Sequence, residues 1–147
     1  MIRAATPNDI PQIWRLIKEL ADYERLSDRV TGSPEALSSH LFKDRLVACL
    51  VLEEKGEIIG YALTYRTYST FLTLPGVWLE DIYVTPSFRG KGFGKALLTH
   101  VVQSAKDSGA GRVEWSVLDW NEPSIQFYQA FGATVMPDWR ICRMELG

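Results

Sequence analysis

Apolar positions recur at two different periods along the chain, and the changes of period divide it into predicted helices and strands. A short apolar strand is predicted at residues 2–5, and apolar residues then recur at helical spacing over residues 10–21. The segment Thr6-Pro7-Asn8-Asp9 precedes this helix and is typical of a helix start, with an N-cap, a proline at the first position and a capping-box carboxylate. Ser33 is expected to cap a second, shorter helix that runs to about residue 42.

The period then shortens to the alternation typical of strands. Strands are predicted at residues 46–52, 58–68 and 77–84, the first two joined by a tight turn at residues 54–57. The remaining predictions are a helix over 92–107, a strand over 112–118, a helix over 121–131, and two closing strands over 133–136 and 139–146. The order β-α-α-β-β-β-α-β-α-β-β predicts one α/β domain over residues 1–147, with a mixed central sheet flanked by helices.

Composition narrows the class of protein. A net charge of −2 gives no electrostatic reason to expect a nucleic-acid partner, and no apolar stretch approaches the ~20 residues of a membrane span. No charged-then-apolar leader opens the chain, so we expect a cytoplasmic protein. Cys49 and Cys142 lie in apolar runs and are predicted to be small buried side chains without a disulfide. His40 and His100 show no paired ligand pattern, so we expect no metal.

One short segment carries candidate chemistry. Residues 89–95, R-G-K-G-F-G-K, follow a predicted strand and lead into an apolar helix. Their spacing fits neither a P-loop nor a dinucleotide fingerprint, but Arg89, Gly92 and Gly94 fit the pattern R-x-x-G-x-G. Glycines let a backbone approach a phosphate, and amide groups at a helix N-terminus point at it. From these residues alone, an anion-binding loop and an ordinary glycine-rich turn with solvated lysines are both open.

The surrounding sequence resembles the GNAT acetyltransferase superfamily. "WLEDIYVTPSFRGKGFGKALL" is similar to the strand, loop and helix with which that family binds the pyrophosphate of acetyl-CoA, and "WNEPSIQFYQAFGA" is similar to its second signature. The resemblance implies the GNAT acyl-CoA N-acyltransferase fold and acetyl-CoA as co-substrate. The residues that it assigns to cofactor binding are Ile82, Tyr83, Val84, Arg89, Gly90, Lys91, Gly92, Phe93, Gly94, Lys95, Asn121 and Ser124.

Five segments resemble the diamine and polyamine branch, which includes spermidine/spermine and thialysine acetyltransferases. They are "RLIKELADYE" at 15–24, "LEDIYV" at 79–84, "RGKGFG" at 89–94, "WNEPSIQFY" at 120–128 and "DWR" at 138–140. The resemblance implies a small primary amine as substrate and a homodimer. The segment after Arg140 is shorter than in the animal polyamine enzymes, which leaves diamines and lysine-like side chains at least as favoured as spermine.

The resemblance implies roles for five side chains. Glu80 would draw a proton from the ammonium group through water and hold the amine, and Tyr128 would protonate the departing thiolate while Phe127 packs. Tyr23 and Glu24 match the acceptor site. The alternatives are a solvated strand-edge carboxylate for Glu80, a core ring for Tyr128 and a solvated helix face for Glu24. Asn121 has the alternative of a simple helix cap.

Two other functions fit the same sequence. The first is a GNAT acetyltransferase with a different acceptor, such as an amino acid, an antibiotic or a protein amine. The second is an acyl-CoA-binding module without turnover. Tyr128 disfavours the second, because a protein that only binds the thioester has no need of an acid at its sulfur.

Overall fold

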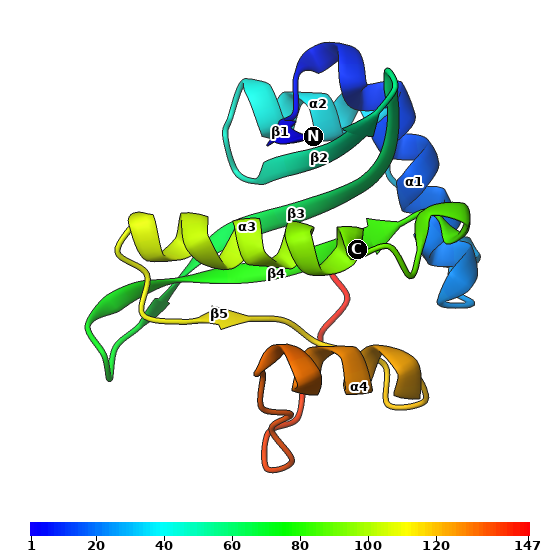
Figure 1. The fold of residues 1–147 in the computed structure, drawn as a ribbon. Coiled ribbons are helices and arrows are strands. Elements are labelled where there is room, and N and C mark those ends of the chain that lie inside the picture. The colour runs from blue at the N-terminus through cyan, green and yellow to red at the C-terminus, as the bar shows by residue number, and fades with distance from the viewer. The chain divides into compact units, whose positions relative to one another are not determined.

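A computed structural model describes residues 1–147 as two compact units, Met1–Ser116 and Val117–Gly147. The first unit contains a five-stranded sheet in the order β1-β2-β3-β4-β5, in which the first four strands are antiparallel and β5 runs parallel to β4 (Figure 1). The strands are β1 Ile2–Ala4, β2 Ala48–Glu54, β3 Glu57–Ser69, β4 Leu74–Val84 and β5 Val113–Glu114. The mixed sheet with flanking helices agrees with the predicted α/β class.

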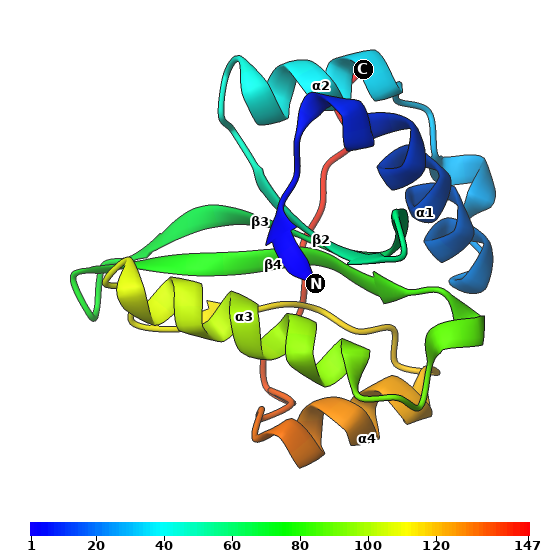
Figure 2. The ribbon, with the colours of Figure 1, turned by 45° about the horizontal axis from the view of Figure 1, so that its top comes forward.

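Three helices belong to this unit: α1 Ile10–Tyr23, α2 Pro34–Phe42 and α3 Phe93–Asp107. Figure 2 shows α1 and α2 over one face of the sheet and α3 over the other. None of the protein's helices has the length and apolar composition that a membrane span requires.

Ion pairs connect the start of α1 to the sheet. Asp9 is buried, and its carboxylate accepts hydrogen bonds from the Thr6 amide at 2.8 Å and from Arg3 at 2.7 Å. Arg3 also pairs with Glu53 of β2 at 2.8 Å. The Arg3 guanidinium lowers the pKa of Asp9 to about 2. The predicted cap therefore also fastens the helix to strands β1 and β2.

The predicted apolar stripe on α1 is buried in part. Ile10, Ile13, Leu16 and Ala21 are buried, and the first three pack with strand residues of β2 to β4. Leu97, Leu98, Val101 and Ala105 are buried along α3. Cys49 is buried in the core, but Cys142 is exposed, so that part of the cysteine prediction is wrong.

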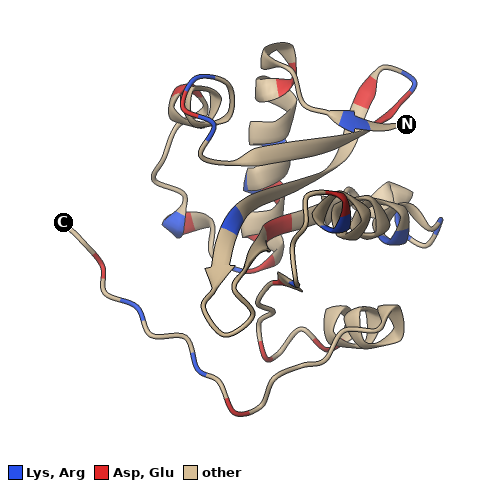
Figure 3. Cartoon of the chain, turned by 90° about the vertical axis from the view of Figure 1, so that its left-hand side faces the viewer, with Lys and Arg blue, Asp and Glu red and all other residues tan.

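The second unit contains one helix, α4 Glu122–Phe131, which ends at Gly132 with φ +116°. The strands predicted at 133–136 and 139–146 are not formed, and the strand predicted at 112–118 is reduced to β5. Figure 3 shows the C-terminal segment as an extended chain that carries both acidic and basic residues. Its Trp139 is 77% exposed. An alternating pattern produces a strand only where another strand supplies hydrogen-bond partners.

Candidate active site

The glycine-rich loop connects β4 to α3 and has the backbone of an anion-binding turn. Gly90 and Gly92 have φ values of +76° and +83°, and nothing lies within 4 Å of where a Cβ would stand on either residue. Gly92 is the N-cap of α3, and the first bond along the helix runs from the Ala96 amide to the Gly92 carbonyl at 3.0 Å. The amides of residues 93–95 therefore have no acceptor within the helix and are available to an anion.

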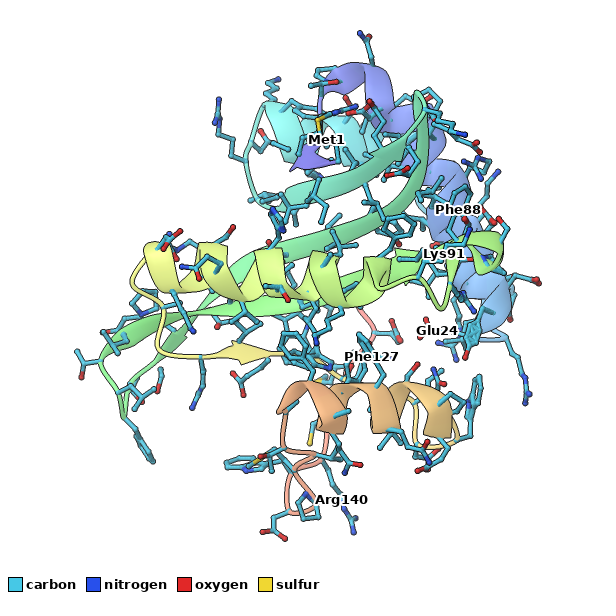
Figure 4. The ribbon with its side chains drawn as sticks, viewed as in Figure 1. Met1, Glu24, Phe88, Lys91, Phe127 and Arg140 are labelled. Carbon is cyan, nitrogen blue, oxygen red and sulfur yellow. The ribbon has the colours of Figure 1, made fainter.

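Positive charge surrounds this turn. Lys91 and Lys95 are exposed, and the Lys91 ammonium lies 5.2 Å from the centre of the Phe88 ring (Figure 4). The loop thus combines available helix amides with exposed cationic side chains, which is a suitable arrangement for a phosphate-bearing ligand.

Arg89 has internal partners that the sequence did not predict. Its Nε donates a hydrogen bond to the Val84 carbonyl at 2.9 Å. The guanidinium carbon lies 5.2 Å from the centre of the Tyr23 ring and 5.3 Å from that of Tyr83. The first residue of the loop motif is therefore held between the C-terminal end of α1 and strand β4.

The backbone of Ile82, Tyr83 and Val84 is paired with β3 on one side only. These residues lie opposite Ala62, Tyr61 and Gly60 of β3. On the other side, β5 pairs with Val77 and Trp78, and the ladder ends there. Strand β4 thus leaves its neighbour before the three residues that the resemblance assigns to the cofactor.

Glu80 lies on a β-bulge of strand β4. Leu63 of β3 is opposite Asp81 and the next residue of β3 is opposite Leu79, so Glu80 has no residue opposite it. A bulge bends its strand and changes the direction of side chains, and bulges are common beside active sites. Glu80 is exposed, and its carboxylate accepts a hydrogen bond from the Trp78 indole at 3.1 Å.

The pKa values of two further carboxylates are raised near this bulge. Asp81 accepts a hydrogen bond from the Tyr61 hydroxyl at 2.9 Å, and burial raises the pKa of Asp81 to about 6, with a contribution from Glu80. Glu24 follows α1 directly, and burial together with the charges of Asp81 and Glu80 raises its pKa. We call Glu24, Glu80 and Asp81 the acidic cluster. Its mutual repulsion favours a bound cation.

Two of the predicted acceptor residues thus interact electrostatically with a carboxylate that the sequence did not single out. Glu24 and Glu80 were predicted, whereas Asp81 was missed together with its partner Tyr61. Ordinary strand alternation points adjacent side chains to opposite faces, so Asp81 beside Glu80 gave no reason to expect a joint site. The signal available was the pair of acids within an apolar strand.

The predicted residues Asn121, Ser124 and Tyr128 belong to the second unit. Asn121 is 6% exposed and occupies the N-cap position of α4, but its side chain makes no capping bond, so a simple cap does not account for it. Tyr128 is partly buried and lies edge-on to Phe127, with ring centres 5.6 Å apart. Phe127, labelled in Figure 4, is 37% exposed, and its assignment as the packing member of the pair stays a prediction.

Comparison with known proteins gives a consistent result. Residues 13–133 match the Acetyltransferase (GNAT) family. The chain is 41% identical to the thialysine N-epsilon-acetyltransferase of Bos taurus, over 99% of this chain and 92% of that protein. It is 33% identical to the L-ornithine N5-acetyltransferase NATA1 of Arabidopsis thaliana, over 97% and 83%.

Solved structures agree on the fold. An aminoglycoside acetyltransferase from an uncultured soil metagenomic sample superposes with a TM-score of 0.83 at 19% identity, covering all of this chain and 96% of the other. At that identity the likeness concerns the fold alone, and the sequence relatives carry the argument about chemistry.

Proposed function

Because the chain belongs to the Acetyltransferase (GNAT) family and is an N-acetyltransferase, we propose that it transfers the acetyl group of acetyl-CoA to a primary amine of a small substrate. The proposed acceptors are diamines, polyamines and amino acids with a lysine-like side chain. The names of two relatives support this class, since thialysine and ornithine both end in a primary amine on a short aliphatic chain.

The observation that carries the proposal is the acidic cluster and its link to the loop through Tyr23. Glu24 is preceded by Tyr23, whose ring contacts Arg89 at the start of the loop. An ammonium group would relieve the repulsion that raises the pKa values of Glu24 and Asp81. An amine bound there would stand next to a thioester held by the loop amides.

The proposed chemistry is direct attack. An alkylamine with a pKa near 10 is almost wholly protonated at pH 7, so it must first lose a proton, which Glu80 draws off through water. The amine nitrogen attacks the acetyl carbonyl carbon, a C–N bond forms and the C–S bond breaks. Tyr128 gives its proton to the departing thiolate, and the proton that the attacking nitrogen loses on becoming an amide restores the Tyr128 phenol. A backbone amide of Ile82, Tyr83 or Val84 polarises the carbonyl.

Two features of the wider setting belong to the proposal. By resemblance to the polyamine branch we expect a homodimer, and from the sequence we expect a cytoplasmic enzyme. The rival acceptors are antibiotics and protein amines, and the rival of another class is a binding module without turnover. The experiment below separates the proposed acceptors from the rival acceptors and from a binding module without turnover.

The test is thiol release from acetyl-CoA at pH 7 and 9 with putrescine, spermidine, lysine, thialysine, an aminoglycoside and a peptide. We expect turnover that rises with pH on one short amine, because more of the amine is neutral at pH 9. Tyr128→Phe should lower kcat about 100-fold and Glu80→Gln at least 10-fold. Tyr68→Phe and Glu35→Gln, which alter exposed residues outside the site, are matched controls. Binding of CoA without turnover on any amine would refute the catalytic proposal.

A further inference from the structure

Arg89 lies where the cofactor loop, strand β4 and the end of α1 meet. Its Nε binds the Val84 carbonyl at 2.9 Å, which fixes the base of the loop to β4. Its guanidinium is close to the rings of Tyr23 and Tyr83, at 5.2 Å and 5.3 Å. Three separate segments of the chain thus converge on one side chain.

These contacts hold the Arg89 side chain in one orientation. A guanidinium is planar, and it stacks on an aromatic ring while its N–H groups donate in fixed directions. Tyr83 is buried, and burial raises the pKa of its phenol while the nearby Arg89 charge opposes that shift. Arg89 is therefore in contact with a ring that is itself fixed in the core.

We propose that Arg89 is a positioning residue that couples the cofactor loop to the acceptor side of the enzyme through Tyr23. Tyr23 is the last residue of α1, and Glu24 of the acidic cluster follows it. Loss of the Tyr23 ring releases one side of Arg89 and loosens the loop that orients the amides of residues 93–95. Affinity for CoA then depends on a ring at the acceptor end of α1. This inference rests on the proposed use of acetyl-CoA.

The coupling has a reciprocal consequence. If the ring of Tyr23 strengthens cofactor binding, a bound cofactor must hold Tyr23 in place by the same free energy. Glu24 is the next residue, so cofactor binding would organise the acceptor site. The inference thus predicts an enzyme in which CoA occupancy favours amine binding.

The test is a double-mutant cycle on the dissociation constant of CoA, measured by calorimetry on the full chain. Tyr23→Leu should weaken CoA binding about 5-fold, since a cation–π contact contributes about 1 kcal/mol. Tyr23→Phe keeps the ring and should restore wild-type affinity. Tyr23→Leu in an Arg89→Gln background should cause no further loss. Tyr68→Leu removes an exposed ring elsewhere and is the matched control.

Each outcome of the cycle supports or overturns the coupling. Wild-type CoA affinity in Tyr23→Leu, or the same 5-fold loss with and without Arg89, would overturn it. The second result would mean that Tyr23 acts through another contact. Failure of Tyr23→Phe to restore affinity would also overturn it, because the phenol and not the ring would then matter. If the wild-type protein binds no CoA, the proposed function itself fails. If Tyr23→Leu raises the KM for acetyl-CoA and leaves kcat unchanged, the result supports a role in positioning and not in the chemical step.

Discussion

Replacing Asp81 by asparagine should stabilise the protein at neutral pH. The pKa of Asp81 is raised from an ordinary 3.8 to about 6, first by burial. Between pH 4 and 6 the folded protein therefore keeps a proton that the unfolded chain has released, and folding becomes less favourable as the pH rises through this window. A difference of about 2 pKa units corresponds to about 2 to 3 kcal/mol of lost stability at pH 7. An asparagine side chain at this position would carry no charge and could still accept the bond from Tyr61.

The measurement is urea unfolding of wild type and Asp81→Asn from pH 4 to 8. The variant should match wild type near pH 4 and gain stability up to about pH 6, reaching a plateau of about 2 to 3 kcal/mol. Asp44→Asn, which alters an exposed carboxylate, should show no such rise. A difference that does not change with pH, or a variant less stable than wild type at pH 7, would refute the reasoning.

Two further substitutions test which contacts stabilise the first unit. The pKa of Asp9 is lowered to about 2 by Arg3, so its contribution is present above pH 4 and lost as the pH falls through 2. Asp9→Asn should therefore cost about 2 kcal/mol at pH 7, and urea unfolding should show that loss shrinking toward pH 2. A Cβ on Gly60 would stand 2.8 Å from the Tyr83 carbonyl oxygen, so Gly60→Ala should cost about 1 to 3 kcal/mol in the same assay. Gly32→Ala meets only an ordinary contact at 3.8 Å and should leave stability nearly unchanged.

Elements whose signals are local were predictable. The chemistry of residues 6–9 specifies a 3-10 turn, Pro7–Asp9, that leads into α1 three residues later than predicted. The turn between β2 and β3 is specified by Lys55 and Gly56, both with positive φ. The helix predicted over 92–107 forms as Phe93–Asp107. The hairpin of β3 and β4 is longer than predicted, reaching Ser69 and starting at Leu74, because pairing of one strand with the other extends both beyond their own patterns.

Elements that depend on a distant partner were not predictable. The strands expected after residue 132 are not formed, because a strand is stable only with a neighbour. The same distinction holds within the site. The loop follows from a short motif, whereas the acidic cluster requires the register shift that leaves Glu80 without an opposite residue. The register shift cannot be predicted from a local sequence motif, since it arises from how β3 and β4 pair over their whole length.

The acidic cluster costs stability, and this cost is itself an argument about function. Raised pKa values at Glu24 and Asp81 mean that the folded protein holds negative charges at a place where burial and repulsion disfavour them. A single cation between them would reverse both effects, because an opposite charge favours the ionised carboxylates. The proposed ammonium substrate would therefore offset the penalty in the free enzyme when it binds. A site built only for an uncharged acceptor would retain the penalty without that offset. The cluster is thus better explained by an amine that arrives charged and loses its proton after it is bound.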